Sequence, residues 1–115
     1  MPLLKIQTSP PVPEAKRADL LSAASRLLAE TTGKPEKYVM VTLAPAEILM
    51  AGQAGPAAFL DVRGIGGLTP DVNRRFSDAF CRLLKDQLGI PAGRVYLTFT
   101  DVPATNWGWN GATFG

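Results

Sequence analysis

An internal repeat of two β-α-β patterns constrains the fold of this chain more than any other feature of its sequence. A repeat of only two units fits a pseudo-twofold domain better than a solenoid. Because such crossovers are right-handed, both helices should lie on one face of one four-stranded mixed sheet. The sequence therefore predicts a single α+β domain over residues 1–115, in the order β-α-β-β-α-β. When the two halves of the sequence are aligned with each other, the matching pairs are Ile6 with Val62, Leu27-Leu28 with Leu83-Leu84, Gly33 with Gly89, Pro35 with Pro91, and Val39 with Val95.

The first unit begins with a predicted strand at Leu3–Gln7. The prolines of Ser9–Pro13 stop it, because proline cannot donate to a sheet ladder. A helix follows and ends at Gly33, and the β-branched run Tyr38–Leu43 predicts a buried strand. The apolar face of the helix, at helical spacing, consists of Leu20, Ala23, Ala24, Leu27 and Leu28.

The second unit follows Ala44–Pro56, which predicts a loop or a short edge hairpin through Ile48–Ala51. Ala57–Val62 resumes as a strand, and Thr69 with Pro70 predicts an N-cap followed by a first-turn proline. The second helix carries an apolar face and ends at Gly89, and the last long strand spans Arg94–Thr100. That face consists of Phe76, Ala79, Phe80, Leu83 and Leu84.

Two helices can cover only one face of the predicted sheet. Strands as apolar as Tyr38–Leu43 are usually covered on both sides. We therefore expect other subunits to bury the uncovered face, and the protein to be an obligate oligomer.

The composition excludes several classes of function. A net charge of +2 provides no polybasic surface for nucleic acid or an anionic membrane. The chain has one cysteine, Cys81, and no histidine, which excludes an internal disulfide, Cys/His zinc sites and histidine-dependent triads. We expect no metal and no cofactor. No apolar stretch approaches the length of a membrane span and no secretion signal precedes the fold, so we expect a cytoplasmic protein.

Pro2 directly follows the initiator methionine. Removing Met1 would expose a secondary amine, and burial or a nearby cation lowers the pKa of such an amine toward the value that suits a general base near neutral pH. From this stretch alone, the alternative is that Met-Pro is a common start and Leu3–Ile6 is only a first strand. At the other end of the chain, Trp107, Trp109 and Phe114 cluster in a tail, which predicts that the tail docks on the domain.

The glycines of Gly64–Gly67 could suggest a phosphate cradle, but the stretch lacks the Walker lysine and predicts a tight turn instead. Through this stretch and several other motifs, the sequence resembles the macrophage migration inhibitory factor (MIF) family of the tautomerase superfamily. This resemblance covers Pro2 to Phe114. The motifs are the start Met-Pro-Leu, Gly33-Lys34-Pro35 before Tyr38, Ile65-Gly66-Gly67-Leu68, Asn73-Arg74, Arg94-Val95-Tyr96, and Asn106-Trp107-Gly108-Trp109-Asn110-Gly111 with Thr113-Phe114.

The resemblance implies a homotrimer and a keto–enol tautomerase that acts on small aromatic 2-keto acids such as phenylpyruvate, or on dopachrome-like compounds. It implies that Pro2 is the catalytic base, that Lys34 holds the substrate carboxylate, and that Ile65 provides a backbone donor beside it. Tyr96 is similar to an aromatic residue contributed by a neighbouring subunit. Tyr38, Trp109 and Phe114 resemble the aromatic walls of the pocket.

Three positions depart from the family pattern. Thr98 stands where animal members commonly have an asparagine that reaches the substrate, and Trp107 replaces a smaller apolar residue, which should narrow the pocket. A Cys-x-x-Cys motif of animal members falls on Ala57 and Leu60, so its thiol-redox activity should be absent. Cys81 lies on a predicted helix face, which favours a packing role over reactivity.

Two other functions remain open at this point. One is a MIF-like cytokine or receptor-binding protein with a vestigial tautomerase pocket. The other is a superfamily relative that acts on halogenated acrylates, although the arginines and the carboxylate that such enzymes place around the proline have no evident match here. Without the resemblance, Lys34 would be a solvated cation after a helix and Tyr96 a strand residue.

Overall fold

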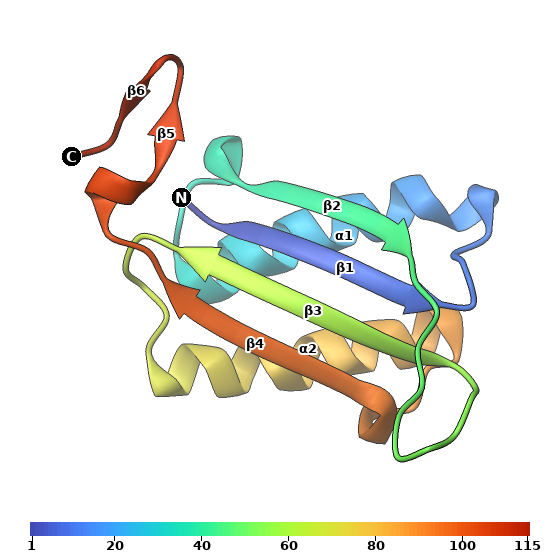
Figure 1. Cartoon of the computed structure of the whole chain (residues 1–115). Coiled ribbons are helices and arrows are strands. Elements are labelled where there is room, and N and C mark those ends of the chain that lie inside the picture. The colour runs from blue at the N-terminus through green and yellow to red at the C-terminus, as the bar shows by residue number, and fades with distance from the viewer.

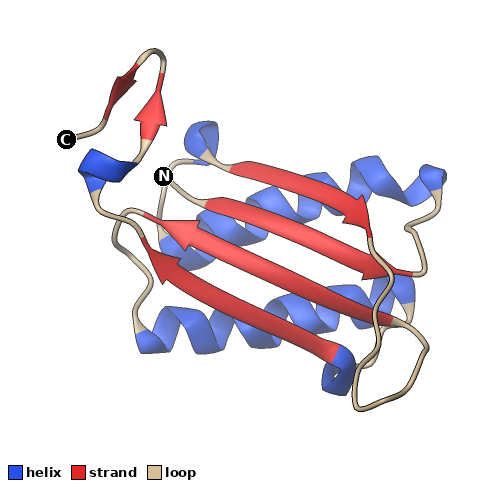
Figure 2. Ribbon diagram, viewed as in Figure 1, coloured by secondary structure: helices blue, strands red, loops and turns tan.

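The computed structural model describes all residues from Met1 to Gly115. Four long strands form one sheet in the order β2-β1-β3-β4, and two long helices cover one of its faces (Figures 1 and 2). This arrangement confirms the predicted α+β fold. The main elements are β1 (Leu3–Ser9), α1 (Glu14–Thr32), β2 (Met40–Pro45), β3 (Ala57–Gly64), α2 (Pro70–Leu88) and β4 (Val95–Asp101). The short ones are η1 (Glu36–Tyr38), η2 (Ala92–Arg94), η3 (Ala104–Asn106), β5 (Gly108–Trp109) and β6 (Ala112–Thr113).

The sheet has the symmetry that the repeat predicts. The central pair β1 and β3 is antiparallel, with Leu3 opposite Arg63 and Ser9 opposite Ala57. Each central strand pairs in parallel with the last strand of its own unit, β1 with β2 and β3 with β4. The two edge strands therefore run in opposite directions, and the two ends of the sheet are related by a pseudo-twofold axis between β1 and β3.

Both helices bury one apolar stripe, at every fourth position, against the sheet. In α1 the buried residues are Leu20, Ala24 and Leu28, and in α2 they are Phe76, Phe80 and Leu84. Each helix ends at a glycine in the left-handed conformation, Gly33 at φ 71° and Gly89 at φ 68°, where a side chain would be strained. No helix combines the length and the apolarity that a membrane crossing requires.

The predicted strand at Tyr38–Leu43 is wrong at its start, because Tyr38 belongs to η1 and the strand begins at Met40. The amide of Tyr38 donates to the carbonyl of Pro35 at 3.1 Å, and the amide of Val39 donates to Glu36 at 2.9 Å. These tight-turn bonds remove both amides from the sheet ladder. Arg94 likewise belongs to η2 and not to the last strand.

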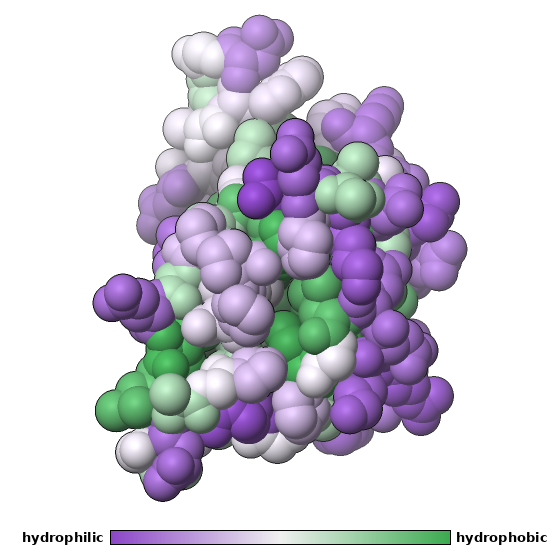
Figure 3. Space-filling model, turned by 90° about the vertical axis from the view of Figure 1, so that its right-hand side faces the viewer, coloured by the Kyte–Doolittle hydropathy of each residue, from purple (hydrophilic) through white to green (hydrophobic).

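The prediction that β2 is buried is also wrong for the single chain, because none of its residues is fully buried. The strand lies at the edge of the sheet, and its Met40 and Thr42 belong to the face that no helix covers. That face also carries exposed Lys5 and Arg63. Seen from the end opposite the N-terminus, much of the surface is hydrophilic, with hydrophobic residues exposed between the polar ones (Figure 3).

The loop between β2 and β3 contains a small hairpin, the second of the two predicted alternatives, although its turn lies at Ala51 and Gly52. Met50 and Gln53 form an isolated antiparallel bridge around Ala51 and Gly52, which have φ values of 53° and 71°. Arg94 holds this loop from the start of β4, because its guanidinium donates to the carbonyl of Pro56 at 2.7 Å and to that of Gln53 at 3.0 Å.

Candidate active site

A cavity of about 380 Å³ lies beside the start of β1. Pro2, which is buried, lines it, and the carbonyl of Pro2 accepts a hydrogen bond from the amide of Met40 at 3.1 Å. Hydrophobic side chains dominate the walls. The lining residues are Met1, Pro2, Leu3, Lys37, Tyr38, Val39, Met40, Trp107, Gly108, Trp109 and Phe114. The structure thus brings together five of the nine predicted site residues, namely Pro2, Tyr38, Trp107, Trp109 and Phe114.

The C-terminal tail forms the outer wall of this cavity. The hairpin of β5 and β6 lies beside the N-terminal end of β1 (Figure 1), and a turn at Asn110 and Gly111, with φ values of 53° and 80°, joins its two strands. The amide of Phe114 donates to the carbonyl of Trp107 at 3.1 Å, which closes the tail on itself. The aromatic tail therefore lies on the domain, as its composition predicts.

Three aromatic rings form a continuous row along the wall. The ring of Trp109 packs edge-to-face on Tyr38, with 5.9 Å between the centroids and 86° between the planes. On its other side Trp109 stacks on Phe114 at 5.8 Å and 10°. Both arrangements are favourable for the quadrupoles of aromatic rings. The row provides an apolar aromatic wall against which an aromatic ligand can pack.

Lys34 follows Gly33, the C-cap of α1, and its side chain contacts the turn that follows β3. Its Nζ atom donates to the carbonyl of Ile65 at 3.2 Å. Partial burial, and next the positive charge of Lys34, lower the pKa of the Met1 amine below its ordinary value. The N-terminal amine of this chain therefore loses its proton at a lower pH than an exposed α-amino group does.

A glycine turn between β3 and α2 lies against the side chain of Lys34. Gly66 and Gly67 have φ values of 68° and 81°, and a Cβ atom on Gly67 would lie 3.0 Å from Cε of Lys34. The carboxylate of Asp101, at the end of β4, accepts a hydrogen bond of 2.7 Å from the amide of Gly66. This bond ties the turn to the end of β4. Sequence reasoning missed Asp101. The signal that could have found it is that the parallel strands β3 and β4 end at the same edge of the sheet.

Two predicted site residues, Tyr96 and Thr98, lie away from the cavity. Tyr96 is opposite Phe59, which in turn is opposite Gln7, so Tyr96 lies toward the end of the sheet farthest from Pro2. Its side chain is 66% exposed, and Thr98 is also exposed. Within one chain neither can touch a ligand beside Pro2. Lys37, by contrast, lines the cavity, and sequence reasoning did not assign it a role.

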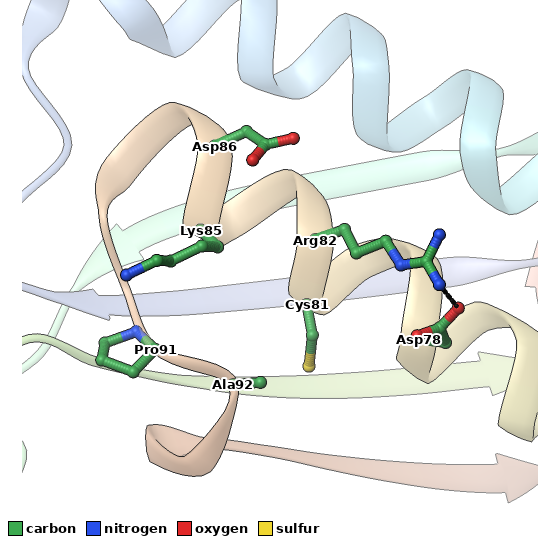
Figure 4. A pocket seen from close by; sticks show the side chains of 7 residues that line it. All are labelled: Asp78, Cys81, Arg82, Lys85, Asp86, Pro91 and Ala92. Atoms are coloured by element: carbon green, nitrogen blue, oxygen red, sulfur yellow. Dashed lines mark ion pairs between the residues drawn. The ribbon is translucent and has the colours of Figure 1, made fainter.

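A second cavity, of about 490 Å³, lies along α2 and is lined by Cys81 and mostly charged neighbours (Figure 4). Asp78 and Arg82 form an ion pair at 2.9 Å on its rim. Burial, and next the charge of Asp78, raise the pKa of the Cys81 thiol. Cys81 is half-buried and packs against the core, which agrees with the packing role predicted for it.

The duplicated four-stranded sheet with two helices on one face is the fold of the tautomerase superfamily, which supports an isomerase kind of reaction. Comparisons with known proteins identify the family. The sequence model described as "Macrophage migration inhibitory factor (MIF)" matches residues 1–115. The chain belongs to the MIF family.

Individual relatives cover nearly the whole chain. The macrophage migration inhibitory factor of Meriones unguiculatus is 37% identical over 118 aligned positions, which cover 99% of both chains. A crystal structure of a homologue from Prochlorococcus marinus is 42% identical, covers 98% of this chain and 99% of its own, and superimposes with a TM-score of 0.92. The structure of Pt0534 inactivated by 2-oxo-3-pentynoate is 25% identical, covers 96% and 94%, and has a TM-score of 0.86.

Proposed function

We propose that this protein is a keto–enol tautomerase of small aromatic 2-keto acids, with the amine of Pro2 as its base once Met1 is removed. One observation carries the proposal. The N-terminal amine lies at an apolar, aromatic-walled cavity where burial and Lys34 both lower its pKa. The same two causes would act on a Pro2 amine, because the buried proline lies one residue deeper. A neutral amine near pH 7 is a competent general base.

The chemistry follows from this placement. The Pro2 nitrogen takes a proton from the carbon next to the ketone of phenylpyruvate, and the electron pair of that C–H bond moves to form the enol double bond. The ketone oxygen takes up a proton, so the reaction only moves hydrogen within the substrate. Lys34 binds the substrate carboxylate, and the aromatic row holds the ring. Positioned proton transfer of this kind contributes about 10²–10⁴-fold in rate.

The proposal includes a homotrimer. Tyr96 is 66% exposed near the start of β4, and both edge strands, β2 and β4, have an unpaired outer side. A threefold arrangement would cover the exposed sheet face and bring Tyr96 of one protomer to the Pro2 cavity of the next. Light scattering should give three times the 12.3 kDa chain mass. A stable monomer at micromolar concentration would contradict the trimer.

The sharpest test of the base is an alanine inserted between Met1 and Pro2. The insertion preserves every side chain but converts the proline nitrogen into an amide, which has no basic lone pair. We expect a folded protein whose phenylpyruvate turnover falls by about 10²-fold or more. Full activity with the extra residue retained, as intact mass would show, would refute the mechanism.

Covalent labelling tests the same atom independently of turnover. The alkyne of 2-oxo-3-pentynoate is an electrophile conjugated to a ketone, so a neutral amine can add to its far carbon. One N–C bond forms, one alkyne π bond breaks, and the amine proton ends on the carbon next to the ketone, so the chain gains the full mass of the reagent. We expect the label on Pro2 in the wild type and none on Pro2 in the insertion variant, where peptide mapping locates any label. A trimer without turnover or labelling would favour the receptor-binding alternative.

A further inference from the structure

Lys37 is the one charged residue among those that line the Pro2 cavity. Its Nζ atom lies 5.0 Å from the centroid of the Tyr38 ring, at the beginning of the aromatic row. No acidic side chain lines the cavity, and no ion pair of the chain involves Lys37. The ammonium group is therefore available to an anion that enters the cavity.

Lys37 and Lys34 act on different parts of the site. Lys34 contributes to the lowered pKa of the N-terminal amine, whereas Lys37 is not among its causes. Lys37 instead stands over Tyr38, the ring that packs on Trp109. A ligand whose reacting carbon lies at Pro2 and whose ring lies on the aromatic row would therefore direct its ring substituents toward Lys37.

We propose that Lys37 binds a second anionic group on the ring end of the ligand, so the preferred ligands are aromatic 2-keto acids with an additional negative charge. The keto-acid part rests on the function proposed above, but the preference for a ring anion is a binding property that can be measured without turnover. Because Lys37 is exposed, water and salt screen the contact, and the expected gain in affinity is about three- to fivefold.

The binding test uses benzoate and terephthalate, which differ by one ring carboxylate and cannot tautomerise. Trp107 and Trp109 are the only tryptophans of the chain and both line the cavity, so intrinsic fluorescence reports its occupancy. We expect the wild type to bind terephthalate about three- to fivefold more tightly than benzoate, with a smaller ratio at high salt. Lys37→Met and Lys37→Gln should reduce the ratio to nearly one.

Lys85→Met is the matched control, because it removes the same charge from the exposed end of α2 and should keep the wild-type ratio. Equal affinity for the two probes in the wild type, or a terephthalate advantage that survives in both Lys37 variants, would overturn the proposal. A Lys85→Met protein that loses the advantage would also overturn it, since net charge would then be the cause.

A turnover experiment separates this proposal from the proposed function. Phenylpyruvate and its ring-carboxylated analogue should both react, with kcat/KM about three- to fivefold higher for the analogue in the wild type only. Turnover of both at equal kcat/KM would retain the tautomerase and refute the role of Lys37. A terephthalate preference that depends on Lys37 without turnover of either keto acid would retain the anion site and refute the tautomerase.

Discussion

The two β-α-β units have the same fold, but residues at corresponding positions have different roles. Superimposing α1 on α2 places Lys34 over Ile90 and Tyr38 over Arg94. The positive charge of Lys34 lowers the pKa of the N-terminal amine, whereas Ile90 is 2% exposed in the core. Tyr38 lines the Pro2 cavity, whereas Arg94 binds the carbonyls of the loop between β2 and β3. Duplication therefore produced two equivalent ends of the sheet, and the site occupies only one of them.

The tail explains why the ends differ. It continues from β4 and lies beside the start of β1, where it completes the aromatic wall around Pro2 (Figure 1). β2 continues instead into the loop that Arg94 holds. The two helices differ as well, because Thr69 caps α2 through the amide of Val72 at 3.2 Å, whereas Pro13 gives α1 no side-chain cap. The sheet itself is nearly symmetric, and the site exists at only one end because the C-terminal tail packs there.

The largest expected effect comes from Ile90→Lys, which gives the second unit the residue of the first. The substitution places an unpaired ammonium in the core, and we expect it to lower the free energy of unfolding by about 3–5 kcal/mol. Urea unfolding followed by circular dichroism measures the change. The reciprocal variant, Lys34→Ile, should remain within about 1 kcal/mol of the wild type, because Lys34 is not part of the core. A tolerated Ile90→Lys would show that the two positions are interchangeable.

Lys34→Ile should instead lower kcat/KM for phenylpyruvate, by about 10- to 100-fold, through loss of a charged hydrogen bond to the carboxylate. Lys34 lowers the pKa of the N-terminal amine, and the base must be neutral to act, so activity rises as pH rises through that pKa. Removing the positive charge raises the pKa and moves this limb of the pH–rate profile to higher pH. An unchanged profile would mean that Lys34 does not act on the base.

The difference in capping predicts a smaller effect on stability. Thr69→Ala removes the oxygen that accepts the amide of Val72 and should cost about 1 kcal/mol, while Thr69→Ser should cost much less. Chemical denaturation of the three proteins measures this. Equal stability of the alanine and serine variants would show that α2 does not depend on its cap.

The smallest effect concerns the tail, which has no counterpart in the first unit. Trp107 lines the cavity with a side chain larger than the one predicted for this position in the family, so we expect the wild type to favour phenylpyruvate over the bulkier dopachrome-type substrates. Trp107→Val should raise the ratio of dopachrome to phenylpyruvate turnover by about threefold. Steady-state kinetics with both substrates measures this ratio. A ratio that does not change in Trp107→Val would exclude Trp107 as a determinant of selectivity for substrate size.

The repeat predicted the fold well because its signals are local. Glycine ends both helices, apolar spacing defines their buried faces, and the tail aromatics indicate docking wherever the tail lies. Tyr38 was misplaced because β-branched neighbours suggest a strand, whereas the hydrogen bond of its amide to Pro35 decides its conformation. Asp101 and Arg94 were missed because their roles depend on partners distant in sequence. Tyr96 lies far from Pro2 within one chain, because the role predicted for it belongs to the cavity of a neighbouring subunit.

The buried position of Pro2 has a consequence for maturation. In the folded chain Met1 is itself half-buried against the cavity, and the carbonyl of Pro2 is hydrogen-bonded to β2. An aminopeptidase needs an extended, accessible N-terminus, so we expect Met1 to be cleaved while the chain is still being synthesised, before β2 pairs with β1. Chains that fold first would keep their methionine. Rapid overexpression should therefore yield two masses that differ by one methionine, and only the lighter species should carry a 2-oxo-3-pentynoate label on Pro2.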